Sequence, residues 1–574
     1  MTLEVRPLRL VIAIISTTLL SRFEQSSKLS GTCSEPEAAS NSCYGGFPRI
    51  ATLVRNARAG STPALFLNAG DTYQGTVWFS VYKWKVVAKF LSILEPDAIS
   101  LGNHEFDDGV DGLIPFINNV TFPVLAANLN LTNEPKLNAT NLAKSVVITV
   151  NGTQVGIIGY LTPETKYISL AGNVIFDDEV EAVSKEAKRL KESGVNILIA
   201  LGHSGFKTDQ KIAAEVEDID LVIGGHDNTF LYTGTQPDSE TPRGLYPTAI
   251  TQSSGKVVYV VQAYAFTKYL GNLSVTFDSE GELTHIEGNP ILVDSSIEQA
   301  ADVLEELEKW RDGIAHLTNT VIGSTRVLVN GDGSCCRQEC NMGNLITDAF
   351  VDYVSEQYSG ANGWTDAAVA VVNGGSIRTS ISTSNNKRIT MADVLAVYPF
   401  NSGVVKVSMT GKKLLSMLEW SINQLTGNTT EELTSSFLQH SGLRVIYNLS
   451  KPANSKVVSV QVRCANCSMP TYSDLNESLT YSVIMDVFIY KGGDGYNMLP
   501  GLEYTALGDN YASPADIIID YLKTHNPVYP AIEGRTSYTK AVDAVDAVDT
   551  DSSASCITFP LTPIILPLLT GILT

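Results

Sequence analysis

The sequence is short of positive charge. Among its 574 residues, Lys and Arg number 40 and Asp and Glu number 61, which leaves a net charge of −21 at pH 7. A protein that tracks the phosphates of DNA or RNA needs a basic surface, so this composition excludes a nucleic-acid binder of that kind. A small anion can still bind, because a metal ion or a local arginine can reverse the sign of the charge at one site.

Charged residues of either sign are also few, at 18% of the chain against 44% hydrophobic residues. This mixture is ordinary for globular proteins and excludes a wholly disordered, collagenous or coiled-coil chain. No internal repeat is longer than the acidic stretch AVDAVDAVDTDSS near the C-terminus. At roughly 150 residues per domain, the length predicts about two to four domains.

The cysteines are 8 in number and fall into local clusters. A zinc knuckle is excluded because the motif C-A-N-C has no second pair nearby. Short-loop disulfides are expected instead, which favours an oxidising compartment. The expected pairs are Cys33 with Cys43, one of Cys335 and Cys336 with Cys340, and Cys464 with Cys467. Cys556 precedes an apolar tail, and its loss with that tail would leave Cys335 or Cys336 unpaired.

Both ends of the chain are apolar. Residues 1–21 hold a short basic stretch followed by LVIAIISTTLL, which predicts a signal peptide, with a buried first strand as the alternative. Ile557–Thr574 is uncharged, interrupted by three prolines and preceded by small residues. It predicts a GPI-attachment signal, with a single-pass anchor as the alternative. We therefore expect a lipid-anchored protein on the extracellular face of the plasma membrane.

Glycosylation sequons agree with secretion. They begin at Asn119, Asn130, Asn138, Asn151, Asn272, Asn428, Asn448, Asn466 and Asn476.

Alternation of short apolar runs with amphipathic stretches predicts an α/β domain over residues 22–295. The expected strands include Ala64–Leu67, Ala98–Leu101, Ile197–Leu201 and Leu221–Ile223, and the expected helices include Glu179–Glu192. Residues 296–318 place apolar side chains on one helical face and predict a linker helix, with Ser295 or Ser296 as its N-cap. A second α/β domain is expected over residues 319–537. Residues 538–574 are expected to form a flexible stalk and the apolar tail.

Four of the apolar runs end in potential metal ligands. Each run is followed by glycine and then by side chains that can bind a cation, namely Asp71, Asn103, His203, His226 and Asn228. Ligands gather beyond the carboxyl ends of strands in an open α/β sheet. Mixed ligation by Asp, Asn and His suits zinc, manganese or iron better than calcium. The pattern therefore predicts a metal centre.

The same motifs suggest phosphoryl chemistry. Asp71 can bridge two ions, and two ions clamp an in-line phosphoryl displacement and activate a water. His104 follows Asn103 and can face the leaving oxygen. Asp107 can orient the imidazole of His104, or it can serve as a helix N-cap.

The motifs NAGDTYQGT, LGNHEFDDG, LGHSG and GGHDNTFLYTG resemble the metallophosphoesterase motifs of the ecto-5′-nucleotidase family. The resemblance continues through ECNMGNLITDA, VVNGGSIR, YPFNS and KGGDGYNMLPG, and covers the chain from Arg22 to about Ser537. It implies a four-layer α/β metallophosphoesterase sandwich that holds two zinc ions, a linker helix, and a C-terminal α/β domain that binds the nucleoside. Rotation of one domain against the other and homodimers made through the C-terminal domain are also implied.

The resemblance also assigns substrate-binding residues. Asn373 and Arg378 would contact ribose and phosphate, Phe400 and Phe488 would sandwich the purine, and Asp494 would hold the ribose hydroxyls. The implied activity is hydrolysis of extracellular nucleoside 5′-monophosphates, above all AMP. An apyrase-like activity on ADP and ATP is one alternative. A catalytically impaired nucleotide-binding surface protein is the other.

That last alternative arises because the chain departs from the family at its start. The family carries N-D-x-H just before S-R-F-E-Q, but here Thr18 and Leu20 stand at the Asp and His positions. By family role, one metal site keeps Asp71, Asn103, His203 and His226, and the other keeps only Asp71 and Asn228. Either the first segment is aberrant, or this is a mono-metal or inactive relative.

A second departure concerns the phosphate-binding arginine. The family pattern C-R-x-x-E-C becomes CCRQEC, which moves Arg337 one place along the chain. If Cys336 is the bonded cysteine, Arg337 can take the phosphate-binding role.

Overall fold

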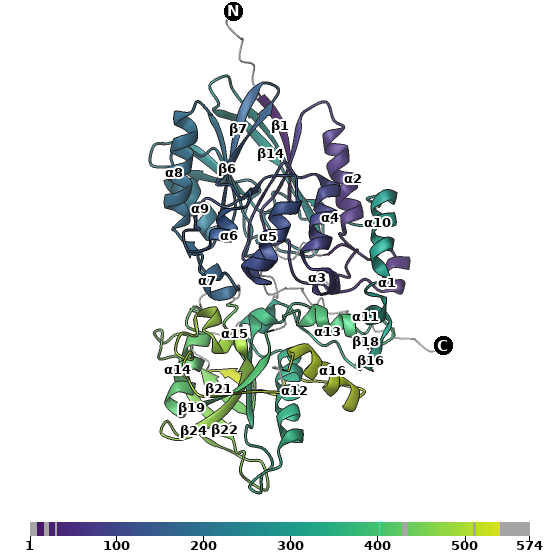
Figure 1. The fold of residues 1–574 in the computed structure, drawn as a ribbon, viewed down its shortest axis with the longest axis vertical. Coiled ribbons are helices and arrows are strands. Elements are labelled where there is room, and N and C mark those ends of the chain that lie inside the picture. Colours follow the sequence, from purple (N-terminus) through teal and green to yellow (C-terminus); the bar gives the residue numbers. More distant parts are fainter. Residues whose placement is uncertain are drawn as a thin grey trace, which may run out of the picture.

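The computed structural model describes residues 8–15, 22–28, 31–400, 402–427, 434–508 and 512–539. Two α/β domains lie one above the other in Figure 1, and the helices α10 (Ala301–Arg311) and α11 (Ala315–Asn319) lie between them in sequence.

Two sheets form the centre of the N-terminal domain. The strands of the first sheet are β1 (Leu8–Ile15), β2 (Ala64–Asn68), β3 (Ala98–Ser100), β4 (Val124–Leu125), β13 (Tyr269–Phe277), β14 (Leu283–Gly288) and β15 (Ile291–Leu292). Those of the second are β6 (Ser145–Val150), β7 (Thr153–Leu161), β9 (Ile197–His203), β10 (Leu221–Ile223), β11 (Thr248–Thr251) and β12 (Val257–Val261). A small pair is made by β5 (Leu129–Asn130) and β8 (Ile175–Phe176).

The strand order is β14-β13-β1-β2-β3-β4 in the first sheet, with β15 beside β13, and β11-β12-β10-β9-β7-β6 in the second. One apolar core joins the two sheets and contains Ile12, Leu67, Ile199 and Leu221. Further cores lie between each sheet and its outer helices. The domain is therefore the four-layer α/β sandwich that the sequence predicts.

The helices of this domain follow the amphipathic stretches. They are α1 (Glu35–Ala39), α2 (Phe47–Arg58), α3 (Val77–Tyr82), α4 (Trp84–Leu94), α5 (Gly109–Asn119), α6 (Pro135–Asn138), α7 (Thr165–Ile168), α8 (Glu179–Glu192) and α9 (Phe206–Glu215), with a 3₁₀ turn η1 (His104–Phe106). The bounds of α8 are those predicted, because the Asp178 side chain accepts the Glu181 N–H and so caps the helix at 3.0 Å.

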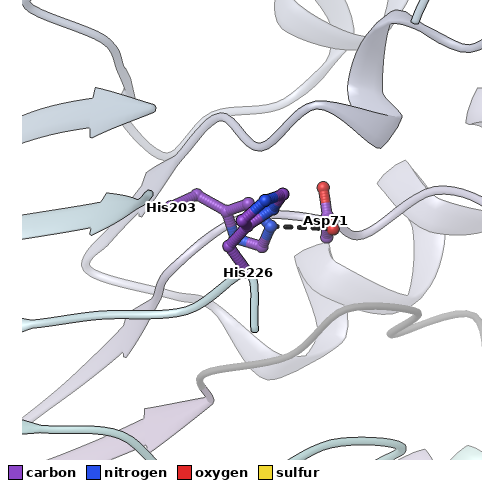
Figure 2. Close-up of side chains that lie close together, drawn as sticks. All are labelled: Asp71, His203 and His226. Atoms are coloured by element: carbon purple, nitrogen blue, oxygen red, sulfur yellow. Dashed lines mark ion pairs between the residues drawn. The ribbon is translucent and has the colours of Figure 1, made fainter. Parts of the chain in front are cut away.

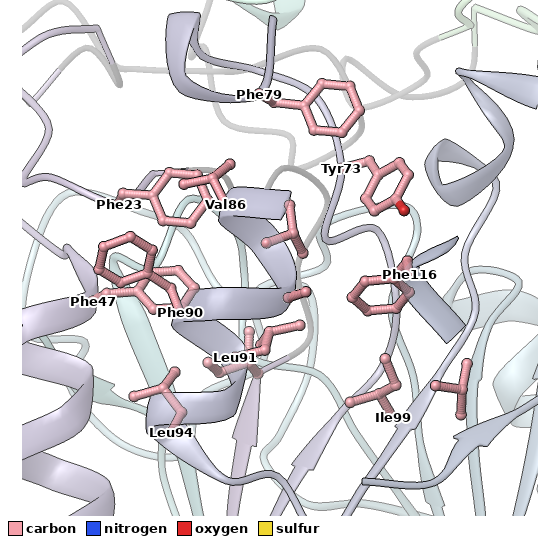
Figure 3. Packing of buried hydrophobic residues seen from close by; sticks show 14 of the residues in the cluster. Phe23, Phe47, Tyr73, Phe79, Val86, Phe90, Leu91, Leu94, Ile99 and Phe116 are labelled. Atoms are coloured by element: carbon pink, nitrogen blue, oxygen red, sulfur yellow. The ribbon is translucent and has the colours of Figure 1, made fainter. Parts of the chain in front are cut away.

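An aromatic cluster fills the space between the first sheet and its helices (Figure 3). The ring of Phe23 lies 5.1 Å from that of Phe47 and 5.2 Å from that of Phe90, measured between centroids. Tyr73, which follows Asp71 by two residues, packs 4.7 Å from Phe79. Because these rings are buried, they fix the loop that carries Asp71 against the helical layer.

The apolar segment near the N-terminus supplies a central strand. Leu8–Ile15 pairs antiparallel with β13 and parallel with β2. Its side chains from Ile12 to Ile15 are buried. A segment that is cleaved off as a leader could not also form this strand. For Leu8–Ile15 the structure therefore shows the buried first strand, which was the alternative to a signal peptide. Thr18 and Leu20 lie outside the described residues.

The predicted linker helix is divided and begins later than expected. Asp294 accepts hydrogen bonds from the Ser296 N–H at 2.9 Å and the Ser296 hydroxyl at 2.6 Å, which forms a turn instead of a first helical turn. The helix α10 begins after Ala300, so the predicted N-cap at Ser295 or Ser296 is wrong. A break at Gly313 separates α10 from α11, where the backbone passes closely over the hydroxyl of Tyr82.

The C-terminal domain also contains two main sheets, ordered β20-β17-β24-β19-β25 and β23-β22-β21-β26. Its strands are β16 (Val321–Ser324), β17 (Val369–Asn373), β18 (Arg388–Thr390), β19 (Val404–Thr410), β20 (Leu438–Ser441), β21 (Leu443–Tyr447), β22 (Val457–Arg463), β23 (Tyr472–Asp474), β24 (Thr480–Asp486), β25 (Tyr504–Ala506) and β26 (Thr536–Tyr538). Its helices are α12 (Asn341–Gln357), α13 (Met391–Val397), α14 (Gly411–Ser421), α15 (Val487–Tyr490) and α16 (Pro514–Thr524), with turns η2 (Gly333–Cys336), η3 (Gly374–Ser376) and η4 (Gly493–Gly495).

The predicted stalk and apolar tail lie outside the described residues, apart from Tyr538 in β26 and the residue after it. Within the part of the chain that the structure describes, no helix combines the length and the apolar character needed to cross a bilayer.

Candidate active site

Parallel pairing brings the predicted ligands to one edge of the sandwich. The strands β1, β2 and β3 run parallel in one sheet, and β7, β9 and β10 run parallel in the other. Asp71 and Asn103 follow β2 and β3, His203 ends β9, and His226 follows β10. The carboxyl ends of both sheets therefore contribute to a single site, as expected for such folds.

Glycine is needed beside these ligands because the backbone approaches them closely. A Cβ atom on Gly102 would lie 2.2 Å from Asp71 Oδ1, and one on Gly225 would lie 2.9 Å from His203 Nδ1. The left-handed backbone is adopted by ligands themselves, with φ of 56° at Asp71 and 86° at His226. Such conformations are costly for these residue types and are concentrated at functional sites.

Three side chains converge at this edge (Figure 2). The ligand atoms of Asp71, His203 and His226 all lie within 4.8 Å of one another. Nε2 of His203 is 2.8 Å from Oδ2 of Asp71. Nδ1 of His226 is 3.0 Å from Oδ1 of Asn103, which brings the fourth predicted ligand to the same place.

The chemistry of this donor set fits a divalent metal ion. Nδ1 of His203 donates to the carbonyl of Ala69 at 2.7 Å, and this leaves Nε2 with a lone pair directed at the carboxylate. Within the described residues, neither His203 Nε2 nor Asp71 Oδ2 has a hydrogen bond, although both are buried. Buried acceptors that face one another are unfavourable unless a cation lies between them.

The pKa values show the same demand for positive charge beside Asp71. Burial raises the pKa of Asp71, but the charges of His203 and His104 outweigh it and bring this pKa below its usual value. Burial lowers the pKa of His203, but the charge of Asp71 outweighs this and raises it overall. Burial and the charge of His203 lower the pKa of His226 to about 3, which keeps this imidazole neutral, as a metal ligand must be. The site thus stabilises a positive charge beside Asp71.

Asn228 is buried two residues after His226 and has φ of 56°. Since Thr18 and Leu20 lie outside the described residues, the second metal ion remains a prediction.

Glu105 is a supporting residue that the sequence analysis missed. Its Oε2 accepts the N–H groups of Asp71 at 2.9 Å and Gly102 at 2.6 Å. Its Oε1 accepts the Thr72 hydroxyl at 2.8 Å and the N–H groups of Thr72 and Tyr73. One fully buried carboxylate therefore ties the Asp71 loop to the Asn103 loop. The signal was its position beside His104 in LGNHEFD.

The loop that carries His226 and Asn228 has a support of its own, which the sequence analysis also missed. The amide of Gln262 donates to the Gly225 carbonyl at 3.2 Å and to Asp209 at 2.7 Å, and its oxygen accepts the Thr229 N–H at 3.1 Å. Asp209 also accepts the hydroxyl of Tyr160 at 2.7 Å. No sequence spacing joins these residues, which come from separate elements.

His104 lies between Asp107 and a residue of the C-terminal domain. Nδ1 of His104 is 2.7 Å from Asp107 Oδ2, whereas the N-cap position of α5 belongs to Asp108, so the N-cap alternative for Asp107 is wrong. On the other side of the ring, the Arg378 guanidinium lies 2.8 Å from His104 Nε2 across a sequence separation of 274 residues. The ring of Phe400 stacks on His104 with centroids 6.2 Å apart.

Asp494 is held by the residues around it. Its carboxylate accepts hydrogen bonds from the Asn373 amide at 2.6 Å and the Ser435 hydroxyl at 3.1 Å. The Ser376 hydroxyl in turn donates to Asn373 at 2.5 Å. Burial raises the pKa of Asp494 to about 6. Phe488 packs over Gly493 in the neighbouring turn, so the predicted nucleoside-binding residues lie together in this domain.

The disulfides correct one prediction and its consequence. Cys33 pairs with Cys43 and Cys464 with Cys467, as expected. Cys335, not Cys336, pairs with Cys340, and Cys336 is itself disulfide-bonded, so the described residues hold no free cysteine. The hypothesis that Cys336 is bonded to Cys340, which was to give Arg337 the phosphate-binding role, is therefore wrong. Arg337 instead ends the turn η2, and its carbonyl accepts the Tyr538 hydroxyl.

Comparison with known proteins agrees with this architecture. A family model described as calcineurin-like phosphoesterase matches residues 25–230, and one described as 5′-nucleotidase, C-terminal domain matches residues 321–501. Fold and site thus define a two-domain, metal-dependent phosphoric monoester hydrolase.

The relatives specify the family more closely. The chain is 45% identical to Protein 5NUC of Lutzomyia longipalpis over 92% of each chain. It is 39% identical to 5′-nucleotidase of Bos taurus, covering 93% of this chain and 92% of that one. A crystal structure of a 5′-nucleotidase precursor from Thermus thermophilus has 33% identity and a TM-score of 0.82, with 93% of this chain and 100% of that one covered. The chain belongs to the 5′-nucleotidase family, as the sequence motifs indicate, and hydrolysis at the nucleotide 5′ position is the activity this supports.

The role of Glu105 can be tested by Glu105→Gln. The amide would direct an N–H₂ group at backbone donors, so we expect the Asp71 loop to loosen and metal affinity to fall by about 10-fold to 100-fold, as for other outer-shell partners. Competition with a chelator measures the metal dissociation constant. Glu37→Gln is the matched control, because Glu37 in α1 also accepts a backbone N–H, that of the N-cap residue Ser34. Equal affinity of the Glu105→Gln variant and the native chain would show that Glu105 does not position the ligands.

Proposed function

We propose that this protein hydrolyses nucleoside 5′-monophosphates, AMP above all, to nucleoside and phosphate, with zinc as its metal. The observation that carries the proposal is the contact between His104 and Arg378. It places a cationic side chain from the nucleoside-binding domain directly beside the metal-ligand cluster of the other domain. A phosphate bound there would meet both domains at once.

The reaction expected is attack of water on phosphorus with departure of the ribose O5′. Bound divalent ions would supply an activated water and neutralise phosphate charge. His104 would hold the proton that the leaving O5′ takes when the P–O5′ bond breaks. Asp107 accepts the Nδ1–H and stabilises the imidazolium form of His104, whose Nε2–H would face the leaving O5′ and give it the proton. Arg378 would exchange its contact with His104 for the phosphate oxygens, which suit its planar donor fork.

The nucleoside would bind through the C-terminal domain. The Asp494 carboxylate, positioned by Asn373, would accept the ribose hydroxyls. Phe400 and Phe488 would stack on the base, a contact of roughly 1–3 kcal/mol per ring by analogy with nucleic-acid stacking.

Zinc is proposed because imidazole, amide and carboxylate donors suit it, and the second ion is the open question. Phosphate release from AMP, ADP and ATP should be measured after chelation and after zinc is restored. We expect zinc-dependent release of phosphate from AMP by the chain as it stands, with one tightly bound zinc.

The double substitution Thr18→Asp with Leu20→His would complete the second set of ligands. We expect this double variant to bind two zinc ions and to gain at least about 100-fold in kcat, equivalent to roughly 3 kcal/mol.

Thr17→Asp with Leu19→His is the matched control, since it adds the same side chains one residue out of register. No release from AMP by either the native chain or the completed variant would refute the nucleotidase. High activity of the native chain with two zinc ions would show that other residues hold the second ion.

The raised pKa of Asp494 predicts a pH dependence of binding. Below pH 6 the carboxyl gains a proton and loses an acceptor, so KM for AMP should rise as pH falls through about 6. The nucleotide phosphate also titrates near pH 6. The Asp494→Asn variant keeps the titration of the nucleotide phosphate and loses that of Asp494, so it isolates the phosphate contribution. Its KM for AMP should be higher than that of the native chain at pH 8 and should vary less with pH. Parallel KM profiles for the two proteins would exclude Asp494 as the titrating group.

We propose further that the protein acts outside the cell, anchored by a lipid. The described disulfides, the sequons and the apolar tail support this, whereas Leu8–Ile15 does not, because it forms β1. The anchor can be tested by treating intact cells with a phosphatidylinositol-specific phospholipase. AMP-hydrolysing activity should then be released from the cell surface into the medium. The homodimer implied by the family resemblance would sediment at about twice the chain mass of 61.9 kDa.

A further inference from the structure

A short segment after β7 joins the metal-ligand cluster to the His104–Asp107 pair. It begins where the Thr162 N–H donates to the carbonyl of His203 at 2.9 Å. It continues through α7 and ends at Ser169, whose hydroxyl donates to Asp107 Oδ1 at 2.7 Å. In Figure 1, α7 lies at the side of the N-terminal domain that faces the C-terminal domain. One end of the segment thus touches a predicted metal ligand, and the other touches the partner of His104.

The Ser169 hydroxyl is not occupied by capping α7. The C-cap hydrogen bond is made by the backbone N–H of Ser169, which donates to the Thr165 carbonyl at 3.1 Å. The hydroxyl is therefore available for Asp107, and the two oxygens of that carboxylate have separate partners. Oδ1 accepts from Ser169, and Oδ2 faces His104 Nδ1 at 2.7 Å.

We propose that Ser169 is a positioning residue for the His104–Asp107 pair. With Oδ1 held by Ser169, the carboxylate cannot rotate away from His104, and Oδ2 stays in line with Nδ1. This fixes the orientation in which Nε2–H of the His104 imidazolium would face the reacting group. The role rests on the proposed function, since it concerns the protonation of the leaving O5′.

A positioning role of this kind depends on the leaving group. The ribose O5′ of AMP leaves as a basic alkoxide and needs a proton as the P–O5′ bond breaks. The p-nitrophenolate of p-nitrophenyl phosphate is a stable anion and leaves without one. Loss of Ser169 should therefore slow AMP hydrolysis but spare p-nitrophenyl phosphate, whereas damage to the metal centre would slow both.

The experiment compares the zinc-loaded native chain with Ser169→Ala, Ser169→Thr and Ser193→Ala on both substrates. Ser193 is the matched control, because it is also the C-cap of a helix in this domain and its exposed hydroxyl donates to the Arg189 carbonyl at 2.9 Å. For Ser169→Ala we expect kcat on AMP to fall about tenfold with KM unchanged, as one lost hydrogen bond to a charged group would allow. Its kcat on p-nitrophenyl phosphate should stay within about twofold, with unchanged zinc content and melting temperature.

We also expect Ser169→Thr, which restores the hydroxyl, to recover AMP hydrolysis. Ser193→Ala should behave like the native chain. An unchanged kcat of Ser169→Ala on AMP would overturn the role of Ser169 alone, because the native chain would still be a nucleotidase. An equal loss on both substrates with reduced zinc would also overturn it, in favour of a structural role. A native chain that does not hydrolyse AMP would overturn the proposed function itself.

Discussion

The active site depends on a buried negative charge that needs a cation beside it. The Asp71 carboxylate has no exposed surface, and its Oδ2 faces Nε2 of His203 at 2.8 Å. Isolated charges are costly to bury, so the surrounding structure must supply both positive charge and hydrogen-bond donors. A bound metal ion would supply the first, and the backbone N–H of His104, which donates to Asp71 Oδ1 at 2.9 Å, supplies the second. The Glu105 carboxylate, which fixes the loops on either side, would be equally costly without its own donors.

The same cluster explains why two domains are needed. The N-terminal sandwich holds Asp71, His203 and His226 together with His104 and Asp107. Arg378 arrives from the other domain and contacts His104 directly. Phe400 comes with it and covers the imidazole ring. The contact between the domains therefore brings a positive charge and an aromatic cover to the same place, and a low-dielectric surrounding strengthens electrostatic interactions there.

The first strand links the stability of the fold to the question of the second metal ion. The strand β1 pairs with β2 on one side and β13 on the other, and its carboxyl end lies at the edge where the ligands gather. By the family resemblance, two metal ligands are expected just beyond this strand, at the positions of Thr18 and Leu20. The strand itself needs only apolar β-forming residues, so its presence does not depend on those two positions.

Local patterns were enough to predict much of the molecule. The strands at Ala64 and Leu221, the helix Glu179–Glu192 and the four ligand loops follow from apolar runs, capping residues and glycine placement, all of which act over a few residues. The N-cap of the linker helix was predicted wrongly, because a turn at Asp294 decides where the helix begins. The sequence left open which of Cys335 and Cys336 is bonded to Cys340, and only the fold around η2 decides it. The contacts of Glu105, Ser169 and Arg378 were visible only in the tertiary structure. Their partners lie tens to hundreds of residues away, and no spacing in the chain encodes a distance across a folded interface.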